Sequence, residues 1–333
     1  MFPRPSSLWA TALLVAAFLG VGCRSYSGDA GNGNGVGLTE TNGVIRVELD
    51  GQLFTEYHFR NVSRPFLYPL LSADGEHLTR RWPQEDVPGE EHDHPHHHAL
   101  WFSHGDANGV DLWSESAKAG TTVHQRFLQQ KSGKDTGVIT SRNEWRAKDG
   151  KVVAHDDRSF RFHRPNGPQR IIDFEITIHA SQGDLTLGDT KEGTFAIRMA
   201  ESMRNMQPKN RPGEGHLVSS RGDKDGAVWG KRAEWVDYYG PVNGKIYGIS
   251  IFDHPTNPRY PTWWHARDYG LFAANPFGLH DFEKREKGAG DFKIAAGGSV
   301  TFRYRVLLHS GDTGTAGIAA RYQEYVRSTD TKP

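Results

Sequence analysis

The 333-residue sequence contains a single cysteine, Cys23, and so lacks most of what cysteine chemistry requires. One cysteine near the N-terminus excludes an internal disulfide, a thiolate nucleophile and a cysteine-ligated metal site in the rest of the chain. Lysine plus arginine and aspartate plus glutamate each total 40, so no basic excess favours nucleic acid as a partner. A Gly-rich phosphate loop, a G-x-S-x-G turn and a Rossmann fingerprint are also absent, which argues against nucleotide-dependent enzymes and serine hydrolases.

Apolar runs of about 20 residues, the length that crosses a membrane, are missing after residue 23. Residues 1–23 combine Arg4 with a shorter apolar run and a small-residue region before Cys23, which predicts a cleaved export signal. The string L-G-V-G-C resembles a lipobox except at Gly20, so lipidation of Cys23 and ordinary secretion both stay open. Either way we expect an exported protein, periplasmic or at the cell surface, with membrane contact only through an N-terminal lipid anchor.

The remaining chain alternates apolar and polar residues with the period of two that is typical of half-buried strands. Residues 24–37, rich in glycine, serine and asparagine, predict a flexible linker, and residues 38–333 predict a single domain. Alternation is clearest in residues 170–179, and Asp50-Gly51 predicts a tight hairpin turn. One amphipathic stripe, from Ile318 to Val326, predicts a C-terminal helix. The pattern predicts an all-β fold, a large antiparallel β-sandwich with one C-terminal helix.

Histidine is concentrated in one stretch, residues 91–113, where six of the 17 histidines lie between His92 and His104. Histidine titrates near neutral pH and is the commonest metal ligand in proteins. Such a cluster indicates metal binding, proton transfer without a metal, or a structural role in which the rings bond to loop carbonyls and carboxylates. The spacing matches no fixed metal-binding motif, so all three interpretations stay open.

An extended conformation after Pro95 would place His96 and His98 on one face and His97 on the other. The pair is therefore a candidate for proton transfer or for metal binding. A divalent ion at this point would be zinc, copper or iron, because all three accept imidazole ligands. The candidate metal ligands are His94, His96, His98 and His104.

Two other stretches carry candidate functional residues. In residues 188–199, the alternation places Phe195 and Ile197 on one face and Arg198 on the other, and Glu192 just before them is a candidate general base. Residues 252–278 contain four prolines and predict a long irregular loop, a common place for functional side chains. The candidate catalytic residues are His96, His98, Glu192 and His265, and the candidate substrate-binding residues are Arg198, Trp101, Trp264, Arg267 and His254.

Two further segments have plainer interpretations. Residues 204–225 are polar and contain glycine and proline, so they predict a long surface loop. Residues 229–239 interleave aromatic side chains with Glu234 and Asp237, which suits either a sugar-binding face or a strand with core aromatics.

Four stretches together resemble a known family. They are R-P-F-L-Y-P-L (64–70), D-H-P-H-H-H-A-L-W-F-S-H-G-D-A-N-G-V-D-L-W (93–113), T-K-E-G-T-F-A-I-R (190–198) and the string from H-P-T-N-P-R-Y-P to A-N-P-F-G (254–278). These strings resemble the exported bacterial family labelled methane oxygenase PmoA, which occurs in planctomycetes and related bacteria. The resemblance runs from about residue 60 to residue 311 and implies a large β-sandwich. It implies no catalytic residues, and the label is not an activity, because the membrane monooxygenase subunit of that name spans the bilayer several times.

These observations favour a sugar-active enzyme of the galactose-mutarotase-like supersandwich kind, similar to aldose epimerases and polysaccharide lyases. Its partner would be a carbohydrate or another small molecule, with proton transfer in a histidine-rich cleft. One alternative is a metal-dependent oxygenase or hydrolase. Another is a non-catalytic cell-surface carbohydrate-binding module, for which an exposed platform is expected from Trp229, Trp235, Trp263 and Trp264.

Overall fold

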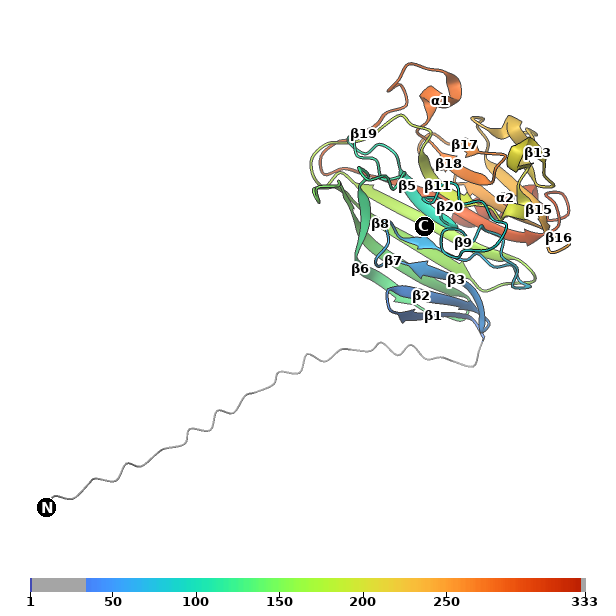
Figure 1. The fold of residues 1–333 in the computed structure, drawn as a ribbon, viewed down its shortest axis with the longest axis horizontal. Coiled ribbons are helices and arrows are strands. Elements are labelled where there is room, and N and C mark those ends of the chain that lie inside the picture. Colours follow the sequence, from blue (N-terminus) through green and yellow to red (C-terminus); the bar gives the residue numbers. More distant parts are fainter. Residues whose placement is uncertain (2–33, 331–333) are drawn as a thin grey trace.

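The computed structural model describes residues 34–330, together with Met1, and shows two eight-stranded antiparallel sheets (Figure 1). The first sheet has the order β1 (Val36–Thr41), β2 (Val44–Leu49), β3 (Gln52–His58), β4 (Phe66–Leu67), β5 (Leu100–His104), β11 (Gly193–Arg198), β18 (Leu271–Asn275), β17 (Trp263–Ala266). The second sheet has the order β14 (His216–Ser219), β15 (Trp235–Val242), β16 (Lys245–Asp253), β20 (Ser299–Ser310), β9 (Arg170–His179), β8 (Val152–His163), β7 (Thr136–Arg146), β6 (Thr121–Lys131).

Smaller elements lie around the two sheets. Two small two-stranded antiparallel sheets are formed by β10 (Leu185–Leu187) with β19 (Phe292–Ile294) and by β12 (Met206–Gln207) with β13 (Arg211–Pro212). The helices are α1 (Leu279–Glu283) and α2 (Ile318–Asp330), and the 3-10 turns are η1 (Glu201–Met203), η2 (Pro208–Asn210) and η3 (Asp225–Val228). Figure 1 shows α1 and β13 at the periphery of the molecule. Among the described residues, no helix is long and apolar enough to cross a membrane.

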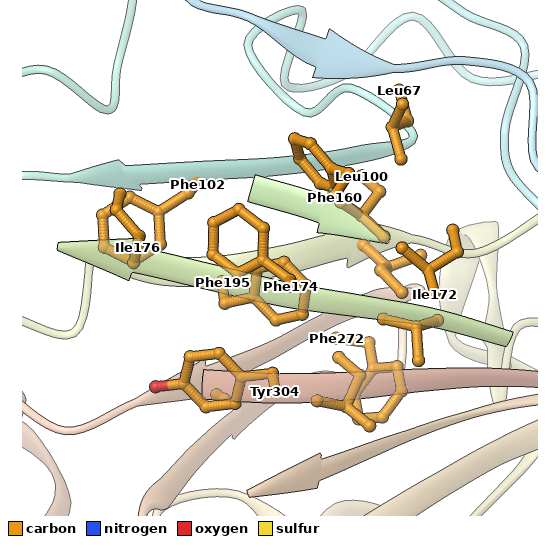
Figure 2. Close-up of a cluster of buried hydrophobic side chains, with 14 of the residues drawn as sticks. Leu67, Leu100, Phe102, Phe160, Ile172, Phe174, Ile176, Phe195, Phe272 and Tyr304 are labelled. Carbon is orange, nitrogen blue, oxygen red and sulfur yellow. The ribbon is translucent and has the colours of Figure 1, made fainter. Parts of the chain in front are cut away.

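The two sheets pack face to face over one hydrophobic core (Figure 2). Phe195 of the first sheet stacks on Phe174 of the second, with ring centroids 4.5 Å apart and an interplanar angle of 11°. Tyr304 of β20 lies 4.9 Å from the same Phe195 ring, and Phe102 of β5 lies 6.0 Å from Phe174. These aromatic contacts join the inner faces of the two sheets, as expected of a sandwich.

The sequence alternation correctly predicts most strands. Strand β9 occupies the predicted residues 170–179, and β2 and β3 form the predicted hairpin, with Leu49 opposite Gln52. Asp50 and Gly51 in the turn have φ angles of 51° and 79°, the left-handed values that a tight hairpin turn needs. Helix α2 packs its apolar stripe against the second sheet, where Tyr322 meets Phe252. The predicted all-β antiparallel sandwich with a C-terminal helix is confirmed.

Several sequence predictions about loops are wrong. Residues 252–278 are not one irregular passage, because they contain β17 and β18, with prolines outside rather than within these strands. Residues 204–225 are not a single loop, since they hold β12, β13 and β14. Strand β5 was not predicted, and all five of its residues are buried, which removes the alternation that would have revealed it.

The N-terminal predictions fall mostly outside the described residues. The export signal, Cys23 and residues 24–33 of the linker belong to that part of the chain. The predicted linker extends too far, because β1 begins at Val36, whose side chain is buried in the core.

Candidate functional site

Four adjacent strands of the first sheet, β5, β11, β18 and β17, carry a row of paired residues on one face. Trp101 is paired with Ala196, Ala196 with Ala273, and Ala273 with His265. Because side chains alternate along a strand and the neighbouring Phe195 lies in the sandwich core, this row points away from the second sheet. The two small alanines leave space above the sheet, which side chains of the adjoining loops enter.

A pocket of about 610 Å³ lies on this outer face. Its lining includes five residues that the sequence predicted to be functional, namely His94, His96, Glu192, His265 and Arg267. They come from three separate stretches of the chain. The structure therefore gathers into one site much of the chemistry that the sequence distributes over about 170 residues.

The histidine segment at the pocket is a turn, so the predicted extended conformation is wrong. His94 has a φ of 42°, and the backbone N–H of His97 donates to the carbonyl of His94 at 2.9 Å. Pro95 takes the second position of this turn, where its fixed φ is favourable. As a result His94 and His97 stack, with centroids 4.7 Å apart, and His96 and His98 do not share a face.

Two buried arginines hold this turn from beneath. Arg198 bonds to the carboxylate of Asp93 at 2.9 Å, and Arg80 bonds both to Asp93 and, at 3.0 Å, to the carbonyl of His94. The two guanidinium groups and the neighbouring His94 ring keep the pKa of Asp93 far below its usual range, against the opposing effect of burial. Arg198, predicted to bind substrate, is fully buried and is a positioning residue for the loop.

A third buried arginine, Arg64, fixes the other end of the loop. It donates to the carbonyl of Trp113 at 2.7 Å and to that of His96 at 3.1 Å. It also pairs with Glu115 at 3.2 Å. The same Glu115 accepts from Nε2 of His98 at 2.8 Å. His98, which the sequence predicted to be catalytic, therefore helps to hold the loop in place. It does not belong to the pocket lining.

The His97 ring has a fixed tautomer. Its Nδ1 lies 3.2 Å from Nη1 of Arg198, and because an arginine can only donate, Nδ1 must be the unprotonated acceptor. Burial, reinforced by the Arg198 charge, holds the pKa of His97 well below its usual value. The ring is therefore neutral at pH 7 and carries its proton on Nε2, which makes it a hydrogen-bond donor at the pocket.

The His265 ring has the opposite tautomer. Its Nδ1 lies 2.6 Å from the carbonyl oxygen of Lys191, and because a carbonyl only accepts, Nδ1 must carry the proton. Burial lowers the pKa of His265 to about 4, so the ring is neutral and its Nε2 is an acceptor. The pocket thus has one histidine that donates and one that accepts, both uncharged at neutral pH.

Glu192 supplies a carboxylate to the same pocket. Its side chain is 40% exposed, and its Oε1 lies 3.2 Å from Nζ of Lys191. The backbone is fixed by Gly105, whose N–H donates to the carbonyl of Glu192 at 2.7 Å. A Cβ at Gly105 would lie 2.8 Å from Cβ of Glu192, so this close approach requires a glycine.

The four predicted metal ligands do not form one group. His98 is bonded to Glu115 and to Gln84, and His104 is buried against Phe277 at a ring distance of 4.8 Å. Within residues 34–330, no three His, Cys, Asp or Glu side chains are arranged to hold a metal ion. The extended strand on which the pairing of His96 with His98 was based is a turn in the structure.

Other predicted substrate-binding residues lie away from the pocket. Trp101 is fully buried beneath His97, with centroids 5.5 Å apart. Trp264 faces the sandwich core and donates to the carbonyl of Ala233 at 3.0 Å. His254 packs against Tyr325 of α2 at 5.5 Å.

The predicted tryptophan platform is also absent from the described surface. Trp235, Trp263 and Trp264 are all buried, at 8%, 6% and 0% exposure. Residues 229–239 instead run into strand β15, whose first four residues are buried.

Sequence analysis missed His97 and Tyr269 at the pocket. Tyr269 stacks on His94 at 5.2 Å, and burial raises the pKa of its hydroxyl to about 12. The R-D-Y-G string that contains it follows β17 directly, so knowledge of that strand would have placed Tyr269 in the β17–β18 turn. His97 was assigned to the opposite face because a period of two was applied to a turn.

Fold and pocket define an all-β sandwich protein with a histidine-lined pocket on the outer face of one sheet. The chain belongs to the family of unknown function DUF6807, whose model matches residues 44–323. This finding corrects the resemblance to the methane oxygenase PmoA family, since no model of that family matches. No curated protein matches the chain in sequence.

Two solved structures are similar to this chain at low identity. One is a galactose 1-epimerase from Lactobacillus acidophilus, with 7% identity, a TM-score of 0.38, and coverage of 83% of this chain and 98% of that chain. The other is a GalM/aldose epimerase homologue from C. elegans, with 8% identity, a TM-score of 0.31, and coverage of 83% and 99%. Likenesses of this size do not establish a shared activity.

Proposed function

We propose that the pocket binds a carbohydrate or a similar polyhydroxylated small molecule and catalyses proton transfer on it. The observation that carries the proposal is the pair of neutral histidines with opposite tautomers, His97 and His265, at one pocket. Hydroxyl groups both donate and accept, so such a pair matches them without a charge. The aromatic side chains of Tyr269 and Trp113 also belong to the lining of the pocket.

In the proposed reaction, the Glu192 carboxylate removes a proton from a carbon beside a carbonyl group. The electron pair of the broken C–H bond moves to the carbonyl oxygen, which becomes an oxyanion. The Nε2–H of His97 donates to this oxygen, and a neutral imidazole suits that task because its donor is available at pH 7 without a competing charge. Return of a solvent-derived proton from Glu192 to the carbon, with the electron pair returning from oxygen, completes a hydrogen exchange.

The proposal predicts that the protein catalyses hydrogen exchange between solvent and a bound sugar. The whole protein is incubated in D₂O with glucose, galactose, glucuronate and galacturonate, and proton NMR follows each carbon-bound hydrogen. We expect faster loss of one C–H signal in at least one of these probes than in protein-free buffer, because the base and the oxyanion donor line one pocket.

The control is His216→Gln, a histidine at the start of β14 in the second sheet, which should exchange at the wild-type rate. Binding of a probe without exchange would contradict the catalytic part of the proposal and favour a binding module. If none of the four probes shows either exchange or binding, the proposal of a carbohydrate ligand is contradicted.

A further inference from the structure

Arg267 differs from the other arginines near the pocket in having no anionic partner. Arg64, Arg80 and Arg198 are buried, and each is paired with a carboxylate. Within the described residues, the Arg267 side chain makes no ion pair and no hydrogen bond, although it is half-buried in the pocket lining. A guanidinium at a pocket with neither an ion pair nor a hydrogen bond has its donors available for a ligand.

The contacts of Arg267 leave its hydrogen-bond donors available. Its guanidinium carbon lies 5.7 Å from the ring centroid of Trp229 and 5.7 Å from that of Tyr269. Aromatic rings interact with a guanidinium as cation–π partners and accept none of its in-plane hydrogen bonds. The rings therefore orient the side chain while its N–H groups, which suit a carboxylate in a two-bond geometry, stay unoccupied.

The other charged side chains of the pocket lining already have partners. Lys191 is paired with Glu192. The Asp111 carboxylate accepts from the backbone N–H groups of Trp113 and Ser114, at 2.7 and 3.0 Å, and from the Ser114 hydroxyl. With His97 and His265 neutral, Arg267 is left as the one charged side chain of the pocket lining, within residues 34–330, that makes neither an ion pair nor a hydrogen bond.

We propose that the substrate carries a carboxylate, and that Arg267 binds it. That the substrate is a sugar rests on the function proposed above. The carboxylate then narrows the substrate class to acidic sugars of the uronic acid type. Arg267 also lies close enough to His265 for its charge to contribute to the low pKa of that ring.

The test compares acidic and neutral versions of the same sugar by calorimetry at low ionic strength. The probes are glucuronate with glucose, galacturonate with galactose, and lactate as a simple 2-hydroxy carboxylate. We expect the wild type to bind the acidic member of at least one pair about 10- to 100-fold more tightly than its neutral partner, the ratio expected for a charge-assisted pair of hydrogen bonds.

Three variants assign this preference to one side chain. Arg267→Gln should abolish the preference, and Arg267→Lys, which keeps the charge without the planar fork, should retain part of it. Arg303→Gln, on β20 in the second sheet and paired with Glu175, is the control and should bind as the wild type does. Thermal unfolding of each variant shows that a loss of binding is not a loss of fold.

The outcomes separate this inference from the proposed function. Equal binding of acidic and neutral sugars, or a preference that survives in Arg267→Gln, overturns the carboxylate inference and leaves the sugar proposal standing. If lactate is the one probe that binds, and its binding depends on Arg267, the carboxylate inference is supported and the sugar proposal is contradicted. Absence of Arg267-dependent binding for every probe overturns the inference.

Discussion

Replacement of Glu192 by glutamine is expected to lower the rate of solvent hydrogen exchange by about 100- to 10,000-fold, the usual contribution of a general base. The amide has the shape of the carboxylate but cannot accept the proton. Because the Glu192 side chain is 40% exposed and pairs only with Lys191, the substitution should leave the fold intact. The measurement is the NMR exchange rate with the most reactive of the four sugar probes.

Glu175→Gln is the matched control, since Glu175 lies on β9 of the second sheet and pairs with an exposed arginine. Its exchange rate should equal that of the wild type. A fall of less than tenfold in Glu192→Gln would contradict the assignment of the base. The acceptor nitrogen of His265 would then be the remaining group with the correct tautomer at the pocket.

Replacement of Asp93 by asparagine is expected to lower the free energy of unfolding by about 3–5 kcal/mol, the cost of removing the carboxylate that two buried guanidinium groups share. The substitution leaves the guanidinium groups of Arg80 and Arg198 buried without a counter-charge. Urea unfolding followed by tryptophan fluorescence measures the effect. Asp157→Asn is the control, because its partner Arg142 is 35% exposed, and it should cost less than about 1 kcal/mol.

The same carboxylate predicts a dependence of stability on pH. The pKa of Asp93 is lowered in the folded protein, so the unfolded chain binds a proton at higher pH than the folded one. Its stabilisation is therefore fully present above the unfolded value of about 3.9 and is lost as the pH falls through the lower folded value. An Asp93→Asn protein with wild-type stability at pH 7, or the same decline below pH 4 as the wild type, would contradict this role.

The sequence predicts those strands that bury one face only. Strand β9 shows the reason, because Ile172, Phe174, Ile176 and Ile178 are buried in the core, whereas Asp173, Glu175 and Thr177, which alternate with them, are less buried. Strands β5, β17 and β18 are buried along their whole length and read as short apolar runs. These three strands carry His265 of the pocket lining, and Trp101 and Ala273 of the row of paired residues beneath it. The part of the fold that builds the site was therefore the part least visible in the sequence.

The convergence of distant stretches was also partly predictable. Residue chemistry alone selected His96, Glu192, His265 and Arg267, and the structure places all four at the pocket. Their roles were not predictable, because the face of a residue follows from the local backbone. At His94–His97 a turn replaced the expected strand. Arg198 lies on the expected face of β11, but its partner Asp93 is 105 residues away in the chain, so its burial could not be inferred.

The central claim is that the pocket holds two neutral histidines with opposite tautomers. Long-range proton–nitrogen NMR of ¹⁵N-histidine-labelled protein, with signals assigned through His97→Gln and His265→Gln, tests it directly. We predict that His97 is protonated on Nε2 and His265 on Nδ1, and that both stay neutral as the pH is lowered from 7 to 5. The same tautomer at both residues, or titration of either ring near pH 6.5, would contradict the account.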